Sequence, residues 1–179
     1  MLLDWAGCAN ARDLGGLPAD GGARIRQGAL LRSGHHAGLR DPGVVRAAGV
    51  SLVLDLRGAR ELADQPSPFA GQAGYAHVPL LMDELTYEID ENSYGPLVDH
   101  NRTEVAAAFR ALAAAPPGGV LVHCQYGRDR TGTLIALALA VAGVAPQVIA
   151  DDYARTEGAP AVRMLATLRH LDDVYGGVA

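Results

Sequence analysis

The chain has 179 residues, 49% of them hydrophobic and 20% charged, with a formal net charge of −5. This composition excludes a largely disordered chain and predicts one globular domain spanning residues 1–179. The acidic balance excludes the basic surface that non-specific nucleic-acid binding needs, so no nucleic-acid partner is expected. All 15 basic residues are arginines.

The longest apolar run, residues 133–145, is shorter than the roughly 20 residues that span a bilayer, so stable membrane insertion is not expected. An acid at Asp4, with no basic leader ahead of an apolar run, argues against a secretory signal. The two cysteines do not form a disulfide framework and favour a reducing compartment, so we expect a cytoplasmic protein.

Strands and helices are expected to alternate along the chain. The hydrophobic patterns predict strands over residues 50–56, 75–80 and 120–123. They predict helices over residues 41–49 with Asp41 as N-cap, 103–115 with Thr103 as N-cap, 130–142, 146–155 and 160–174. Residues 82–101 are acidic and irregular and predict a long loop. The alternation predicts an α/β fold with a central, mainly parallel twisted sheet flanked by helices.

The most informative segment follows the third predicted strand, where residues 123–132 read HCQYGRDRTG. A loop between a strand end and a helix start presents N–H groups that have no partner inside the helix, and the helix dipole favours an anion there. We therefore predict a phosphate-binding loop made of Gln125, Tyr126, Gly127, Arg128, Asp129, Arg130 and Thr131.

Each polar residue of this loop has an expected role. The local field favours Cys124 as a thiolate nucleophile, against the alternative of a buried and inert thiol. Arg130 can hold two phosphoryl oxygens at once, and Thr131 can donate its hydroxyl to the sulfur when the sulfur leaves. His123 is expected to orient the loop rather than to act as a base. Cys8 lacks such surroundings and is expected to be structural.

Residues 123–132 resemble the signature loop of the cysteine-dependent tyrosine phosphatases, and most of all the atypical bacterial tyrosine/dual-specificity branch with the pattern HCxxGKDRTG. Four further segments are similar to segments of that family and follow the same order: residues 10–16 (NARDLGG), 28–34 (GALLRSG), 53–57 (VLDLR) and 149–153 (IADDY). Arg128 departs from the pattern, because the family has lysine there.

The resemblance implies a tyrosine-phosphatase-like fold and metal-free, cofactor-free hydrolysis of phosphate monoesters through a cysteinyl-phosphate. It implies phosphorylated proteins or small phosphate monoesters as substrates, and phosphate or vanadate as inhibitors. Two aspartates compete as general acid. Asp129 matches the acid proposed in this branch, and Asp83 lies where related phosphatases carry the acid on a mobile loop.

The strand end at residues 55–61 should neighbour the loop in a parallel sheet. Asp55, Arg57 and Glu61 are therefore expected to be ion-pair partners that support the loop, and not catalysts. The pair His35–His36 has no companion at metal-ligand spacing and is expected in an exposed turn, so no metal site is predicted.

Three alternative functions remain open at this point. A second arginine, Arg128 beside Arg130, suits a phosphoinositide phosphatase, because additional phosphates require additional cations. A phosphate-binding module without turnover is the second alternative, and a rhodanese-type sulfur transferase is the third. The sequence does not set the oligomeric state.

Overall fold

The computed structural model describes residues 1–80 and 92–176. Its strands form one sheet of five in the order β1-β2-β5-β3-β4. They are β1 (Arg12–Asp13), β2 (Leu30–Ser33), β3 (Val50–Asp55), β4 (Tyr75–His77) and β5 (Gly119–His123). Only β1 runs antiparallel to its neighbour, and the other three pairs are parallel. The predicted mainly parallel sheet is confirmed.

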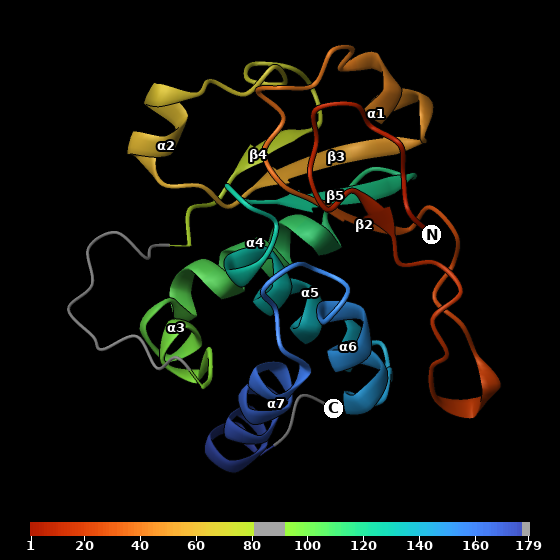
Figure 1. The fold of residues 1–179 in the computed structure, drawn as a ribbon, viewed down its shortest axis with the longest axis vertical. Coiled ribbons are helices and arrows are strands. Elements are labelled where there is room, and N and C mark those ends of the chain that lie inside the picture. The colour runs from red at the N-terminus through yellow and green to blue at the C-terminus, as the bar shows by residue number, and fades with distance from the viewer. Residues whose placement is uncertain (81–91, 177–179) are drawn as a thin grey trace.

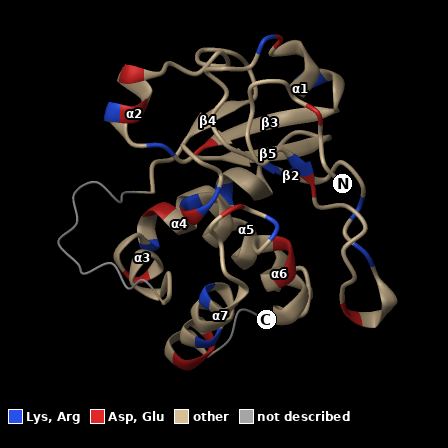
Figure 2. Ribbon diagram, viewed as in Figure 1, with Lys and Arg blue, Asp and Glu red and all other residues tan. Residues whose placement is uncertain are grey.

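Helices lie on both faces of this sheet. They are α1 (Gly43–Ala47), α2 (Ala59–Asp64), α3 (Gly95–His100), α4 (Arg102–Ala113), α5 (Asp129–Val141), α6 (Pro146–Tyr153) and α7 (Ala161–Tyr175), with a short 3-10 turn η1 at Asp20–Gly22. Figure 1 shows α1 and α2 on one side of the sheet and α3 to α7 on the other. Charges of both signs are scattered over these elements, as Figure 2 shows.

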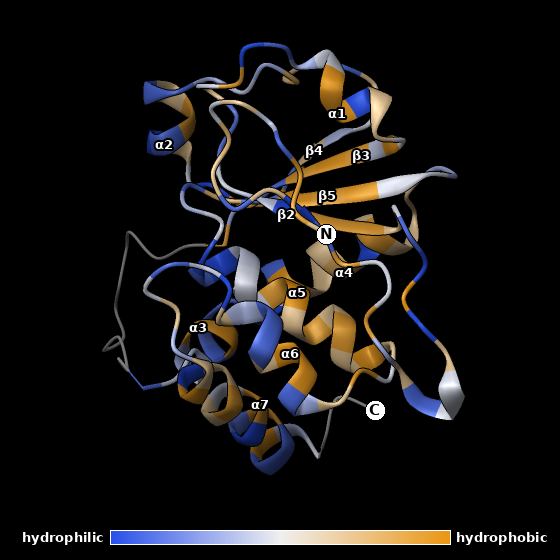
Figure 3. Ribbon diagram, turned by 45° about the vertical axis from the view of Figure 1, so that its right-hand side comes forward, coloured by the Kyte–Doolittle hydropathy of each residue, from blue (hydrophilic) through white to orange (hydrophobic). Residues whose placement is uncertain are grey.

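The strands are apolar because both of their faces are covered. Successive side chains point to opposite faces, so Leu52 and Leu54 pack in the core beneath α5, whereas Val53 packs in the core on the α1 side. In β5, Val122 and Leu121 divide in the same way. Figure 3 shows the resulting hydrophobic band through β3, β5 and α5.

The structure corrects four expected boundaries. The N-cap of α1 is Pro42 and not Asp41, which accepts the Gly43 N–H instead. The second predicted strand ends at His77, ahead of Pro79. Thr103 is not an N-cap, because α4 begins at Arg102. The predicted long loop contains α3, which begins with Gly95-Pro96, and proline is well tolerated in a first helical turn. The remainder of that loop, residues 81–91, lies outside the described residues.

Strands β1 and β2 and helix α2 were not predicted. They are two, four and six residues long, too short for a hydrophobic period to develop. In β2 the buried positions include Arg32 and Ser33, which a search for apolar strands passes over.

The chain connections diverge at the carboxyl end of the central strand, β5. Strands β3 and β5 are neighbours, but α2 follows β3 on one side of the sheet and α5 follows β5 on the other (Figure 1). In open α/β sheets the chains diverge at such a point, and ligands bind there. Within the described residues, no helix is long and apolar enough to cross a bilayer.

Candidate active site

The carbonyl groups of the loop after β5 accept hydrogen bonds from surrounding residues, and these bonds hold the loop in place. The carbonyl of Gln125 accepts the N–H of His35 at 3.1 Å, and the carbonyl of Tyr126 accepts Asn10 Nδ2 at 2.8 Å. The carbonyl of Gly127 accepts Arg32 Nη2 at 2.8 Å. The carbonyl of Arg128 accepts the N–H of Gly132 at 2.8 Å within the start of α5. Four consecutive carbonyls are therefore bound to the framework.

The N–H groups of the same loop are not used in this way. In the part of the chain that the structure describes, the backbone N–H groups of residues 125–129 donate no hydrogen bond. Consecutive backbone donors of this kind at the positive end of a helix form a site for an anion. Gly127 makes the turn possible, because its φ of +68° is readily adopted only by glycine.

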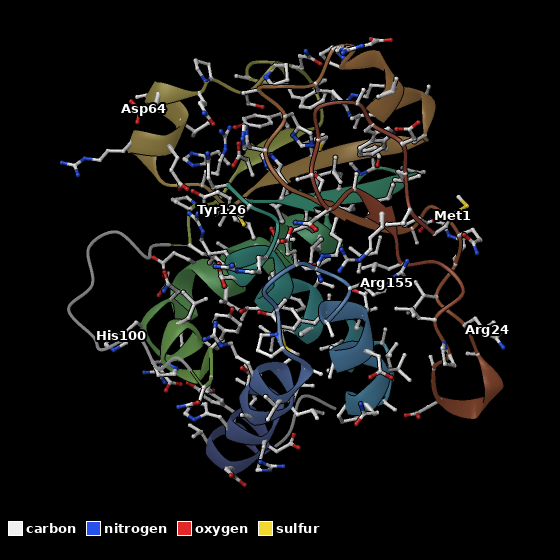
Figure 4. All side chains as sticks on the ribbon, in the orientation of Figure 1. Met1, Arg24, Asp64, His100, Tyr126 and Arg155 are labelled. Atoms are coloured by element: carbon white, nitrogen blue, oxygen red, sulfur yellow. The ribbon has the colours of Figure 1, made fainter. Side chains whose placement is uncertain are left out.

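Cys124 directly follows β5 at the start of the loop, and Figure 4 labels Tyr126 two residues further along. Cys124 is only 2% exposed and packs in the core cluster on the α5 face of the sheet. Thr131, in the first turn of α5, is completely buried, and its hydroxyl has no hydrogen-bond partner among the described residues. A buried hydroxyl without a partner is costly, and such groups concentrate at functional sites.

Arg130 is held by a residue of α2. Its Nη1 and Nη2 donate to the two carboxylate oxygens of Glu61, each at 2.6 Å. Burial raises the pKa of Glu61, but the bonds from Arg130 and from the Gly58 N–H more than offset this and hold the pKa below its ordinary value. A bidentate pair of this kind fixes the plane of the guanidinium group. The structure therefore places Glu61 beside the loop, as the parallel sheet predicts.

Asp55 ends β3 beside His123 of β5, and Arg57 follows two residues later, so both neighbour the loop as expected. Arg57 donates through Nε and Nη2 to the Asp55 carboxylate at 2.8 to 3.2 Å. Burial raises the pKa of Asp55, but these bonds and nearby His123 outweigh it and lower the pKa. Burial also lowers the pKa of His123 to about 4, so its ring is neutral near pH 7. His123 Nδ1 lies 3.4 Å from the Cys124 carbonyl, which suits a role in orienting the strand end.

A second buried ion cluster lies on the other side of the loop. Arg12 and Arg32 both bind the Asp152 carboxylate, at 2.9 and 3.3 Å, and all three side chains are almost completely buried. Burial and the charge of Arg12 lower the pKa of Arg32 to about 10, although Asp152 partly offsets them. Two cations share one buried anion, so the cluster adds positive potential next to the loop. Three of the family-like segments meet here.

The prediction of an exposed His35–His36 turn is wrong for His36, which is 2% exposed. Its Nε2 lies 3.1 Å from the Ser33 hydroxyl, and its ring packs edge-on against Phe69 and His123. Burial and the neighbouring His123 lower the pKa of His36 to about 2. A histidine pair in a polar stretch gives no sequence signal for burial, because the contacts come from β5 and from residues near 69.

Of the two candidate acids, Asp129 is at the site, at the first position of α5, and Asp83 lies outside the described residues. Arg128 donates through Nε to both oxygens of Asp129, at 3.1 and 3.2 Å. The hydroxyl of Tyr94 also donates to Asp129. Sequence reasoning missed Tyr94, which lies within the stretch predicted as a loop.

A cavity of about 460 Å³ opens beside the loop, lined among others by Asn10, His35, Tyr126 and Arg128. Tyr126 is 67% exposed at its rim. Cys8 lies nearby in the N-terminal segment, where burial raises the pKa of its thiol to about 11. Within residues 1–80 and 92–176, no group of three or more His, Cys, Asp or Glu side chains is arranged to hold a metal ion.

Comparison with known proteins identifies the family of this chain. The sequence profile of the tyrosine phosphatase family matches residues 3–178. The chain is 33% identical over 162 residues to a Cupriavidus necator protein named "Putative tyrosine-protein phosphatase", a match that covers 81% of this chain and 59% of that protein. It is 33% identical over 125 residues to a tyrosine-protein phosphatase of Nostoc commune, covering 64% of this chain and 42% of the relative.

A third relative is the triple specificity protein phosphatase PtpB of Mycobacterium tuberculosis, 28% identical over 191 residues. That match covers 84% of this chain and 67% of the relative. The chain thus spans roughly half the length of the first two relatives.

Proposed function

Because this chain belongs to the tyrosine phosphatase family, we propose that it hydrolyses phosphate monoesters, phosphotyrosine among them, through a cysteinyl-phosphate at Cys124. The observation that supports this most is the loop over Cys124, whose carbonyls are bound outward and whose N–H groups at residues 125–129 are unused. A phosphoryl group seated among those donors lies against the sulfur.

In the first step the Cys124 thiolate attacks phosphorus. The S–P bond forms, the P–O bond to the ester oxygen breaks, and the leaving oxygen takes a proton from a general acid. The loop N–H groups and Arg130 hold the phosphoryl oxygens, so positioning and electrostatic stabilisation supply most of the acceleration. Glu61 keeps the Arg130 guanidinium in one orientation for this purpose.

In the second step water attacks the cysteinyl-phosphate. The general acid, now a carboxylate, accepts a proton from the water, the P–S bond breaks, and phosphate leaves. The sulfur departs as a thiolate, and the buried Thr131 hydroxyl is available to donate to it. The chain returns to its starting state with no other reactant consumed.

The direct test compares the two cysteines. Cys124→Ser should lower kcat on a phosphotyrosine peptide and on 4-nitrophenyl phosphate by at least about 10³-fold. Cys8→Ser is the matched control and should retain activity, because the Cys8 thiol donates to the Gly34 carbonyl at 3.8 Å and takes no part in either step. Equal activity in the wild type and in Cys124→Ser contradicts the proposal. Thiosulfate:cyanide sulfur transfer without phosphatase activity would favour the rhodanese-type alternative.

We assign the general acid to Asp129, because it lies in the first turn of α5, where the loop meets the helix. General acid catalysis contributes roughly 10²- to 10⁴-fold, so Asp129→Asn should lower kcat/KM on phenyl phosphate by about that factor. Asp83→Asn is the comparison. If Asp83→Asn is impaired and Asp129→Asn is not, the assignment is reversed.

Multiply phosphorylated substrates are a second candidate, and the position of Arg128 favours them. Its side chain is 38% exposed and lines the cavity beside the loop, where a second phosphate group would find a cation. The mycobacterial relative is named a triple specificity phosphatase, which is compatible with a wider substrate range. The substrate preference is tested by comparing the rates on a phosphotyrosine peptide, a phosphoserine peptide and phosphoinositides at matched concentration. Arg128→Lys tests whether a second phosphate group needs the planar guanidinium group or only a positive charge.

A further inference from the structure

Tyr94 connects three helices to the loop. It immediately precedes α3, is 4% exposed, and its N–H donates to Thr167 Oγ1 of α7 at 2.8 Å. Its hydroxyl contacts Asp129 in α5, the Tyr153 hydroxyl in α6 at 2.7 Å, and Arg163 Nη1 in α7 at 3.2 Å. Nothing in the two-step reaction described above uses Tyr94.

The direction of these hydrogen bonds follows from which of the groups can donate and which can accept. A tyrosine hydroxyl has one proton and can also accept, whereas arginine only donates and an ionised carboxylate only accepts. The proton of Tyr94 is therefore donated to Asp129, and its oxygen accepts from Arg163 and from Tyr153. Burial and the bond to Asp129 raise the pKa of Tyr94 far above its ordinary value, so this proton stays in place throughout the working pH range.

The two oxygens of Asp129 consequently have different surroundings. Oδ1 accepts from Tyr94 and from Arg128 Nε, whereas among the described residues Oδ2 accepts only from Arg128 Nε, at 3.2 Å. A proton on the carboxyl group is excluded from the oxygen that faces two donors. It resides on Oδ2.

We propose that Tyr94 is a positioning residue for Asp129: it anchors Oδ1, so that Oδ2 carries the proton that passes to the leaving oxygen. This inference rests on the proposed function. As the P–O bond breaks, the Oδ2 proton moves to the ester oxygen and Asp129 becomes a carboxylate. In the second step the attacking water returns a proton to Oδ2. Tyr94 keeps its own proton in both steps.

The other groups facing Asp129 keep their charge during this cycle. They are Arg128 from the loop, Tyr153 from α6 and Arg163 from α7. The bond to Asp129 raises the pKa of Arg128, the bond to Tyr94 raises that of Arg163, and burial raises that of Tyr153.

The test is Tyr94→Phe, which keeps the ring that packs edge-on against Tyr153 and beneath Arg163. A positioned acid matters more for a poor leaving group than for a good one. The variant should lower kcat/KM by about 10-fold on phenyl phosphate, and by less than about 2-fold on 2,4-dinitrophenyl phosphate. Added to Asp129→Asn, it should have no further effect, because both changes remove the same contribution.

Tyr175→Phe is the matched control, since the Tyr175 hydroxyl of α7 donates to the Asp99 carboxylate of α3 at 2.5 Å and contacts no loop residue among those described. It should leave both substrates unaffected. Equal losses on both substrates in Tyr94→Phe, or a full additional loss on top of Asp129→Asn, would overturn the inference. A wild-type protein that hydrolyses neither substrate would instead refute the proposed function.

Discussion

Single side chains determine how the loop is held. Asn10 and Arg32 each bind one loop carbonyl, and Glu61 binds both outer nitrogens of Arg130. The segments containing Asn10 and Arg32 were identified from the sequence by resemblance, but their task was not predictable. Each acts on a backbone atom about one hundred residues away, and no local pattern encodes such a contact.

Glu61→Gln should weaken catalysis without removing a reacting group. The glutamine is uncharged, so the guanidinium group of Arg130 is no longer held in one orientation by an ion pair. Misplacing a group that binds the substrate by about 1 Å can lower the rate by about 10²-fold. We expect kcat/KM on 4-nitrophenyl phosphate to fall by about 10- to 100-fold. Glu104→Gln, on α4, is the control. Unchanged kinetics in Glu61→Gln would show that Arg130 holds its orientation without this carboxylate.

The two cysteines should differ in their reaction with iodoacetamide at pH 7. Burial holds the pKa of Cys8 at about 11, so almost none of it is thiolate, and thiolate is the reactive form. We expect alkylation of Cys124 alone, with protection by inorganic phosphate, as mapped by peptide mass spectrometry. Faster modification of Cys8 than of Cys124 would contradict an activated thiolate in the loop.

At the scale of elements, the strand–loop–helix unit of β5 and α5 was predicted closely, because its apolar strand and helix have clear periods. The helix begins at Asp129, one residue before the predicted start. The approach of α6 was not predictable: Gly132 has no side chain, and a Cβ there would lie 2.8 Å from the Tyr153 ring. This close packing brings Tyr153 to Tyr94.

Gly127→Ala tests the loop conformation. A Cβ at Gly127 would lie 2.4 Å from the Ser33 carbonyl oxygen, in addition to the cost of its positive φ. Gly22→Ala is the control, because it has a similar φ of +77° with no atom within 4 Å of the added Cβ. We expect Gly22→Ala to lower the free energy of unfolding by about 1–2 kcal/mol with normal activity. Gly127→Ala should cost more and abolish phosphate binding; equal effects would refute the clash.

At the scale of the whole molecule, the parallel sheet and its covered faces were predicted, because continuous apolar strands occur where helices cover both faces. The polar groups in the interior of the molecule were not predicted. Arg12, Arg32, Asp55, His36 and His123 are all buried, although their residue types predict exposure. Only tertiary pairing shows that such groups have partners.

The buried histidines make stability depend on pH. The pKa of His36 is lowered to about 2 and that of His123 to about 4, so the unfolded chain binds more protons below about pH 6.5. Their stabilising contribution is present above pH 6.5 and is lost as the pH falls. The slope approaches roughly 1.4 kcal/mol per pH unit for each histidine. Urea unfolding measured between pH 7 and 5 should show this loss of stability, and the free energy of unfolding should depend less steeply on pH in His36→Gln. An unchanged dependence on pH in that variant would contradict the prediction.

The most direct test of the catalytic account is to trap the intermediate. Wild-type protein mixed with phosphotyrosine peptide and quenched in acid within milliseconds should carry a phosphoryl group on the peptide that contains Cys124, as detected by mass spectrometry. Cys124→Ser should release no phosphate. Rapid phosphate release by the wild type with Cys124 unmodified at every quench time would contradict the account.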